Sequence, residues 1–396
     1  MKTSLLCRLV SAVLITGVVG TSLAAAEPAA SSASATLAAP AAAGIWKTAF
    51  YKRGFVGLYQ AKWAGGEAGE GLVREGVVIP FDGTKVRVWL NSAREQDIVL
   101  GRMSLALGTD AEGGTDGRFT PITFGGAPGV TIAAKQKEFA SDEVAMPVHA
   151  GQWYLQQNYT SDKYPYAYDA DGFFRVATDE LKTPAADSYR KGSWVGNVYR
   201  IDVFTSDTRP VVLCYGDSIT QGVGSTAKSG HRYPTLLGEL LDRPVLNLGV
   251  NGDLAKYARG VPGLVGRLDG VESIVFLMGI NDIIGGSLKT PDEYIATITA
   301  TAAAIKQGGR KFYLGTITPA GGYAKFDADP AKEALRQSVN EWIRNQKVAD
   351  GVIDFDAALR DPKNPVRLLA DYQSDWLHPS DAGYARMAEA AAKILR

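Results

Sequence analysis

The chain of 396 residues has two different patterns of hydrophobic and polar positions, one in each half. From Ile45 to about Ser206, short alternating runs such as residues 85–90 are separated by stretches rich in Gly or Asp. A period of two turns one row of side chains toward a core and the other toward water, as in a β-strand. No long stretch in this half carries a helical period. We therefore predict an all-β sandwich or jelly-roll domain over residues 46–206.

The pattern of hydrophobic positions changes at Arg209 and Pro210. From there on, compact apolar runs alternate with helical patterns. The apolar runs are residues 211–215, 245–249, 273–279, 311–317 and 351–355, and the helical patterns are residues 233–241, 255–268, 291–307, 331–347 and 381–395. Thr290, Pro291 and Glu293 support the start of the third of these helices, as a cap residue, a Pro at the first helical position and a Glu three residues after the cap. Five strands alternating with helices predict an α/β fold over residues 207–396, a doubly wound parallel five-stranded sheet with helices on both faces.

The first 26 residues have the pattern of a cleavable signal peptide. Lys2 and Arg8 supply positive charge, residues 9–19 are mostly apolar, and small residues precede Glu27. A retained membrane anchor is the alternative, but the apolar core is short for a span and includes polar residues. We therefore expect a secreted or periplasmic protein without stable membrane insertion.

Composition narrows the functional classes further. Residues 27–45 are nearly all Ala, Ser and Pro, which predicts a flexible linker. The 42 Lys and Arg residues balance the 42 Asp and Glu residues without a basic stripe, so nucleic acid is not an expected partner. Cys7 would leave with the signal peptide, and Cys214 lies inside an apolar run, where we interpret it as a buried hydrophobic residue. Without Cys7 the chain has one cysteine and three histidines, which are few of the usual zinc ligands. We therefore expect no metal and no cofactor.

Ser218 follows the first apolar run of the α/β half. In doubly wound sheets ligands bind beyond the carboxyl ends of the strands, so a Ser on the turn at residues 216–220 would face the crevice. A helix-capping Ser is an equally plausible interpretation from these residues alone. No Gly stands two residues after Ser218, so the motif is not the nucleophile elbow of α/β-hydrolases.

A catalytic serine needs a base, and the chain contains only His149, His231 and His378. His149 lies in the β half and His231 has no Asp at a suggestive spacing, so we interpret both as structural or surface residues. His378 stands three residues after Asp375, in a loop before the last helix. One turn would let Asp375 hold the Nδ1 proton of His378 and leave Nε2 facing Ser218. A surface Asp turn with a satisfied His is the alternative.

Acyl transfer also needs hydrogen-bond donors for an oxyanion, and two further strand ends offer them. Residues 247–253 follow the second run, where a Gly lets a backbone N–H approach a substrate closely. Asn281 follows the third run and brings an amide group to the same edge. Each segment alone is a common turn. Together with Ser218 and His378 they predict a site for acyl transfer.

These segments resemble the four blocks of the SGNH, or GDSL-like, hydrolases. The matching residues are Gly-Asp-Ser-Ile at 216–219, residues 247–252, Gly-x-Asn-Asp at 279–282 and Asp-x-x-His at 375–378. They occur in the family's order across residues 211–396, and the resemblance implies a flavodoxin-like α/β fold for that half. Ile219 stands where many members have Leu, which is a common variant.

The resemblance also implies a role for each matched residue. The triad it implies consists of Ser218, Asp375 and His378. The oxyanion hole it implies consists of the N–H groups of Ser218 and Gly252 and the side chain of Asn281. Gly249 competes for the second block, but the spacing from Asn247 favours Gly252.

The β half is more loosely similar to the N-terminal domain of a subgroup of bacterial SGNH esterases, through residues 86–92 and 122–126. Members of that subgroup are similar to xylanase-cluster esterases and to arylesterases. The resemblance implies a serine esterase that works through an acyl-enzyme on short acyl groups, with acetylated polysaccharide or aryl esters as substrates. A Tyr-rich segment at residues 153–168 is a candidate for sugar contact. The alternatives are a lipase or lysophospholipase, and a catalytically inactive carbohydrate-binding protein.

Overall fold

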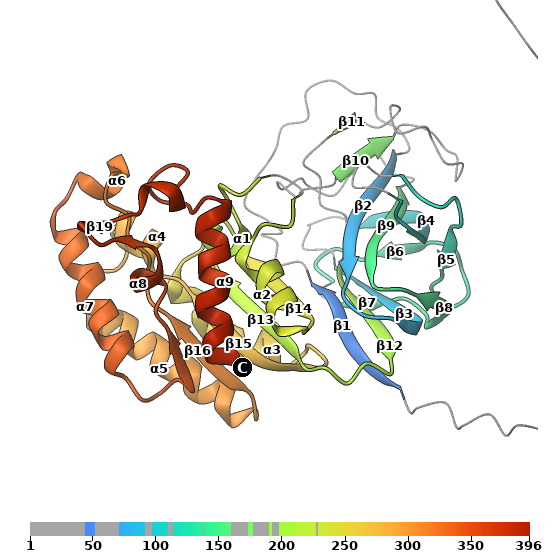
Figure 1. Ribbon diagram of the computed structural model, residues 1–396. Coiled ribbons are helices and arrows are strands. Elements are labelled where there is room, and N and C mark those ends of the chain that lie inside the picture. The colour runs from blue at the N-terminus through green and yellow to red at the C-terminus, as the bar shows by residue number, and fades with distance from the viewer. Residues whose placement is uncertain are drawn as a thin grey trace, which may run out of the picture. The chain divides into compact units, whose positions relative to one another are not determined.

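Figure 1 shows the fold in a computed structural model of the chain. The structure describes residues 44–51, 71–91, 97–109, 114–136, 138–159, 173–176, 190–191, 198–226 and 229–396. The predicted signal peptide, nearly all of the predicted linker and most of the Tyr-rich segment lie outside the described residues.

The described residues before position 206 are rich in strands. These are β1 (Ile45–Tyr51), β2 (Gly71–Ile79), β3 (Gly83–Leu90), β4 (Ile98–Leu107), β5 (Thr120–Ile122), β6 (Val130–Ile132), β7 (Phe139–Ala140), β8 (Val144–Val148), β9 (Gly151–Tyr159), β10 (Phe173–Val176), β11 (Arg190–Lys191) and β12 (Val198–Thr205). One sheet has the order β1-β12-β3-β7 with β8 also paired to β3, and the other has the order β11-β10-β2-β9-β4-β5 with β6 paired to β4. In β3 the predicted alternation is confirmed, because Val86, Val88 and Leu90 are buried while their neighbours are partly exposed. The sandwich or jelly-roll arrangement stays a prediction.

The second half is built on a parallel sheet of five strands, as predicted. Its strands are β13 (Val211–Gly216), β14 (Val245–Gly249), β15 (Val271–Leu277), β16 (Lys311–Gly315) and β17 (Gly351–Ile353), in the order β14-β13-β15-β16-β17. The chain moves from β13 outward to β14 and then crosses back to β15 on the other side. In doubly wound sheets ligands bind at such a reversal, which here lies at the carboxyl end of β13, the strand that leads into Ser218.

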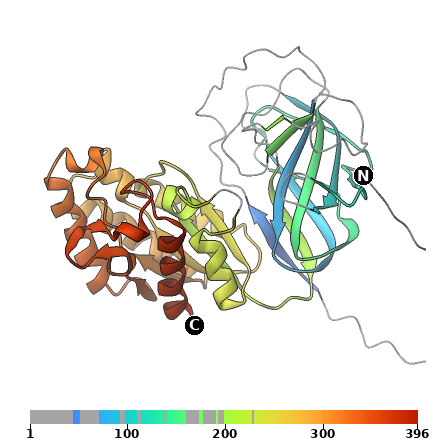
Figure 2. The same ribbon diagram turned by 45° about the horizontal axis from the view of Figure 1, so that its top comes forward.

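The longer helices cover both faces of this sheet (Figures 1 and 2). The helices of this half are α1 (Ser218–Gln221), α2 (Tyr233–Leu241), the 3₁₀ helix η2 (Ala255–Gly260), α3 (Val261–Val265), α4 (Ile280–Ile284), α5 (Pro291–Gln307), α6 (Ala324–Asp327), α7 (Ala331–Asn345), α8 (Phe355–Leu359), the 3₁₀ helix η3 (Ala370–Tyr372) and α9 (Asp381–Leu395). Helix α9 packs against α2 and α8, whereas α5 packs against α3 and α7. A short hairpin, β18 (Arg360–Asp361) and β19 (Asn364–Leu368), precedes η3.

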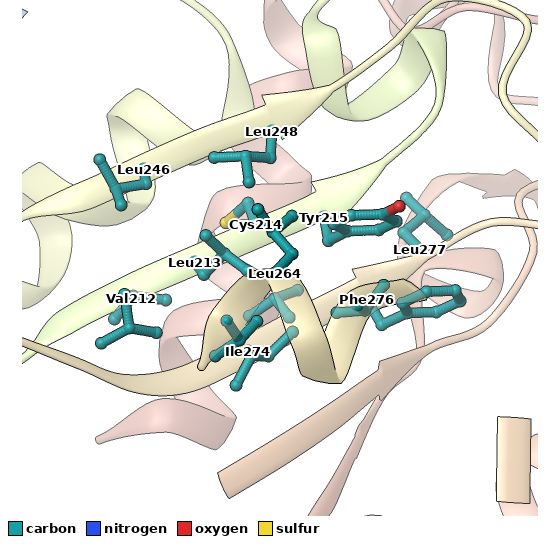
Figure 3. Close-up of a cluster of buried hydrophobic side chains, with 14 of the residues drawn as sticks. Val212, Leu213, Cys214, Tyr215, Leu246, Leu248, Leu264, Ile274, Phe276 and Leu277 are labelled. Atoms are coloured by element: carbon teal, nitrogen blue, oxygen red, sulfur yellow. The ribbon is translucent and has the colours of Figure 1, made fainter. Parts of the chain in front are cut away.

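Side chains of the central strands meet in one buried cluster (Figure 3). Every residue of β13 is buried. The rings of Tyr215 and Phe276 stack at 5.7 Å between centroids, and Phe276 lies 5.8 Å from Phe312 on the next strand. Burial of a side chain of this size stabilises the fold by about 2 kcal/mol relative to its exposure. The strand that leads into Ser218 is therefore held in a close-packed core.

One expected helix is divided. Residues 255–268 were expected to form a single helix, but η2 ends at Gly260 and α3 runs only from Val261 to Val265. Pro262 has no N–H to donate to an earlier carbonyl, and Gly260 is a poor helix former, so an uninterrupted α-helix is disfavoured here. In η2 the hydrogen bonds instead join residues three apart, as in a 3₁₀ helix. One example runs from the N–H of Tyr257 to the carbonyl of Leu254.

Helix α5 begins where the sequence predicts, but without a capping hydrogen bond from the Thr290 side chain. Thr290 is the N-cap residue and Pro291 takes the first helical position, as predicted, but the Thr290 side chain makes no capping hydrogen bond. The Glu293 carboxylate accepts from the N–H of Lys289 instead of that of Thr290.

Among the described helices, none has the length and apolar character needed to cross a bilayer.

Candidate active site

Ser218 begins α1 immediately after β13, and it is only 2% exposed. The N-cap is its neighbour Asp217, whose carboxylate accepts from the N–H of Ile219 at 3.0 Å. The interpretation of Ser218 as a capping residue is therefore wrong. Its hydroxyl is left for another partner.

That partner is the imidazole of His378. The Ser218 Oγ lies 2.9 Å from His378 Nε2, and the Nδ1 atom of the same ring lies 2.8 Å from Asp375 Oδ2. A carboxylate can only accept, so we assign the ring proton to Nδ1. Nε2 then has a free lone pair for the Ser218 hydroxyl proton. The fold thus joins two residues three apart in a loop to a serine 160 positions earlier.

Asp375 also shapes the turn that carries His378. Its Oδ1 accepts from the N–H groups of Leu377 at 3.0 Å and His378 at 2.7 Å. Partial burial opposes ionisation of this carboxyl group, but the hydrogen bonds from His378 and Leu377 hold the pKa of Asp375 below its ordinary value. Asp375 is therefore a carboxylate at neutral pH, as a partner for an imidazole requires.

The turn between Asp375 and His378 is strained. Trp376 has a φ of 67°, a conformation that is unusual for a bulky residue and costs on the order of 1–3 kcal/mol. Its N–H donates to the Gln373 side chain at 3.0 Å, and its ring lies 5.5 Å from the Arg367 guanidinium. Strain of this kind persists only where the surroundings fix the conformation, and here those two contacts hold Trp376, two residues before His378.

The loop after α1 packs directly against the His378 loop. Gly224 has a φ of +91°, and a Cβ atom there would lie 2.4 Å from Ser374 Oγ and 3.1 Å from His378 Cβ. The Cβ atom of any other residue at position 224 would therefore displace Ser374 or His378. The Tyr384 hydroxyl donates to the carbonyl of Val223 at 2.6 Å and so ties the same loop to α9.

The two glycines that compete for the second block have different surroundings. The N–H of Gly249 already donates to Asn247 Oδ1 at 2.9 Å, and a Cβ atom on Gly249 would lie 2.0 Å from the Gln221 nitrogen. Gly249 therefore serves close packing of β14 against α1. Gly252 has a φ of +77° and open space around its α-carbon, and its N–H has no hydrogen-bond partner among the described residues. Of the two, Gly252 is the one able to donate to a substrate.

The Asn281 side chain approaches the same loop from α4. Its Nδ2 donates to the carbonyl of Asp253 at 3.1 Å. An amide NH₂ group carries two protons, so the second remains for another acceptor. The predicted donors thus lie at the ends of β13, β14 and β15, which are neighbours in the sheet.

Two of these donors have a buried acidic neighbour in the chain: Asp217 precedes Ser218, and Asp282 follows Asn281. Burial raises the pKa of Asp217 to about 7, although the N–H of Ile219 opposes the shift, and the carboxylates of Asp253 and Asp282 raise it further. Burial likewise raises the pKa of Asp282, against the hydrogen bonds from the Ala255 and Lys256 N–H groups. These pKa shifts could not be predicted from the sequence, because they depend on how deeply each carboxyl group is buried.

The raised pKa of Asp217 predicts how stability depends on pH. An unfolded Asp titrates near pH 4, so between about pH 4 and about pH 7 the folded state holds a proton that the unfolded state lacks. The free energy of unfolding therefore falls as pH rises through that window. Asp217→Asn, which is neutral and can still accept from Ile219, should raise Tm relative to the wild-type protein more at pH 8 than at pH 5. Differential scanning fluorimetry at both pH values tests this, and a pH-independent difference contradicts it.

The remaining histidines and Cys214 lie apart from the triad. His149 has a side chain 69% exposed. His231 is half exposed, as expected of a surface residue, but it does have an Asp partner: its Nδ1 lies 2.7 Å from Asp381 Oδ2, 150 positions away. Cys214 is fully buried, which raises the pKa of its thiol to about 12. Among the described residues, no three His, Cys, Asp or Glu side chains are grouped so as to hold a metal ion.

A serine hydroxyl, an imidazole and a carboxylate joined in this order are the arrangement of the serine hydrolases. Residues 214–386 match the family model described as GDSL-like Lipase/Acylhydrolase family. This part of the chain is therefore a GDSL-like acylhydrolase domain, as predicted, and the protein is a carboxylic ester hydrolase.

Solved structures resemble part of the chain at low identity. A carbohydrate acetylesterase family member from Sinorhizobium meliloti is 19% identical, with a TM-score of 0.38, over 47% of this chain and 97% of that one. The aryl esterase of M. smegmatis is 16% identical, with a TM-score of 0.38, over 47% of this chain and 98% of that one. No curated protein matches the chain.

Proposed function

We propose that this protein is an exported serine esterase that hydrolyses carboxylic esters through an acyl-enzyme on Ser218. The observation that carries the proposal is the continuous chain of hydrogen bonds from Ser218 through His378 to Asp375. The Gly252 and Asn281 donors, which follow the ends of the two neighbouring strands, support acyl transfer over other uses of a serine and a histidine.

In the proposed first half-reaction, Ser218 Oγ attacks the ester carbonyl carbon and gives its proton to His378 Nε2. The carbonyl oxygen becomes an oxyanion, which accepts from the N–H groups of Ser218 and Gly252 and from the Asn281 amide. His378 then donates its proton to the departing alcohol oxygen as the ester C–O bond breaks. Asp375 remains ionised and stabilises the imidazolium that forms between these two transfers.

In the second half-reaction water takes the place of the alcohol. His378 removes a proton from the water while its oxygen attacks the acyl carbon, and the same donors stabilise the second oxyanion. The bond from Ser218 Oγ to the acyl carbon breaks, and His378 returns its proton to Ser218. The products are an alcohol and a carboxylic acid, and the enzyme is regenerated.

The finer part of the proposal concerns the substrate. We infer short acyl groups, with acetyl esters of carbohydrates or aryl esters as the class, on the basis of the sequence likeness to bacterial SGNH esterases. The test is a panel of acetylated xylan, acetylated monosaccharides, aryl esters of rising chain length and lysophospholipid. Rates that fall as the acyl chain lengthens would support the inference. Preference for long chains or lysophospholipid would favour the lipase alternative, and no turnover of any ester would favour the inactive binding protein.

Export and the β half are parts of the same proposal. The pattern of residues 1–26 supports a cleavable signal peptide, which would deliver the protein to the periplasm or the medium. The mass of the exported protein should then correspond to a chain that begins at Glu27. Residues 46–206 are proposed as a β-sandwich or jelly roll, and the two antiparallel sheets with buried alternate side chains support this architecture.

A further inference from the structure

The loop that carries Gly252 is exposed at its tip but tied down at its base. Asn251 and Gly252 are exposed, whereas Val250 and Asp253 on either side are buried. The N–H of Val250 donates to the carbonyl of Gly216 at 3.0 Å. A tip of this kind has little packing of its own, so hydrogen bonds from neighbouring elements must fix its position.

Gln221 supplies one of these hydrogen bonds from the helix of Ser218. It is the last residue of α1, one helical turn after Ser218, and its side chain is partly buried. Its Oε1 accepts from the N–H of Asn251 at 2.8 Å. The residue directly before Gly252 is therefore joined to the helix that begins with the nucleophile.

Asp282 supplies the matching contacts from the helix of Asn281. Its Oδ2 accepts from the N–H of Ala255 at 2.7 Å, and it also accepts from the N–H of Lys256. Asp282 is only 3% exposed, so this contact is well shielded from water. Together with the bond from Asn281 to Asp253, it anchors the far side of the loop to α4.

We propose that Gln221 and Asp282 are positioning residues that hold the three oxyanion donors at a fixed mutual spacing. The proposal rests on the function proposed above. Ser218, Gly252 and Asn281 come from three separate segments, and their donors must all lie about 3 Å from one oxygen atom. Gln221 sets the spacing between the first two segments, and Asp282 sets the spacing between the last two. Neither side chain has to touch the substrate, because each acts through the backbone of the Gly252 loop.

The first test removes the acceptor oxygen of Gln221. Its control removes an equivalent acceptor oxygen elsewhere in the chain. Gln221→Met keeps the length of the side chain but loses the hydrogen bond to Asn251. We expect kcat on an aryl acetate to fall by about tenfold to a hundredfold, since a misplacement of about 1 Å is enough for such a loss, while KM changes less than about twofold. Gln346→Met is the control, because Gln346 Oε1 accepts from the N–H groups of Val348 and Ala349 at 2.6 and 2.8 Å, beyond the end of α7. It should lower Tm comparably and leave kcat unchanged.

A second test variant, again with a matched control variant, examines Asp282. Asp282→Ala removes both acceptor oxygens, so the N–H groups of Ala255 and Lys256 lose their partner, and kcat should fall with little change in KM. Its control is Asp142→Ala, because Asp142 also accepts from two successive N–H groups, those of Gly125 at 2.9 Å and Gly126 at 2.8 Å. Gln221→Glu keeps an acceptor oxygen at the same reach and should retain at least threefold more turnover than Gln221→Met.

The outcomes separate this proposal from the proposed function. Wild-type protein and Ser218→Ala are measured in the same assay, and hydrolysis by the first but not the second upholds the esterase whatever the other variants do. With the esterase upheld, unchanged kcat in Gln221→Met and Asp282→Ala overturns the positioning role. A rise in KM that matches the fall in kcat also overturns it, because it marks a ground-state contact. So does a Gln221→Glu variant as slow as Gln221→Met. No hydrolysis by the wild-type protein rejects the esterase, and the positioning role with it.

Discussion

Ser218→Ala is expected to lower ester hydrolysis by about 10⁵-fold to 10⁶-fold, the scale seen when the nucleophile of a serine hydrolase triad is removed. Without Oγ no acyl-enzyme can form, and the residual rate comes from the oxyanion donors and substrate binding alone. The fold should survive, because Asp217 and not Ser218 caps α1. The measurement is turnover of an aryl acetate, with Tm as the check on folding.

Ser225→Ala is the matched control for this prediction. Ser225 lies in the loop after α1, and its hydroxyl donates to the carbonyl of Gly222 at 2.6 Å. Its loss removes a local hydrogen bond without touching His378, so turnover should stay within a few-fold of wild type. A fluorophosphonate should label the wild-type protein and the Ser225→Ala variant, but not Ser218→Ala. Near-normal turnover in a folded Ser218→Ala protein would exclude Ser218 as the nucleophile.

The sheet of the second half could be predicted from the sequence because its strands are buried on both faces. Such strands are compact apolar runs, and β14 follows residues 245–249 as expected. Helices α2, α5 and α9 also have the expected bounds, since each carries a clear period of 3.6. Local patterns fail where neighbours decide the outcome, as in the division at Gly260 and Pro262.

The candidate site could be predicted as far as its residues follow strand ends. Ser218 and Asn281 were accessible to sequence reasoning because the parallel topology brings all strand ends to one edge. The pair of His231 and Asp381 was missed, because no local spacing joins residues 150 positions apart. The contacts of Gln221 and Asp282 were missed for the same reason: each bonds to a loop whose position depends on the fold.

Asp375→Asn is expected to lower turnover by on the order of 10⁴-fold, the effect of the same change in a serine protease triad. The variant should keep its turn, since Asn still offers Oδ1 to the N–H groups of Leu377 and His378. At the Oδ2 position, however, an NH₂ group would face His378 Nδ1 at 2.8 Å. Two donors cannot bond, so the ring proton would move to Nε2. That tautomer cannot accept the proton of Ser218.

The pair of His231 and Asp381 offers a control with the same chemistry outside the triad. Asp381→Asn alters a contact of 2.7 Å between Asp Oδ2 and His Nδ1, but on a His side chain that is half exposed. Because His231 exchanges no proton with Ser218, turnover should fall by less than about tenfold. NMR of the imidazole nitrogens should show the Nε2–H tautomer of His378 in Asp375→Asn and the Nδ1–H tautomer in Asp381→Asn. If the two variants lose turnover equally, Asp375 acts through the general stability of the loop and not through the tautomer of His378.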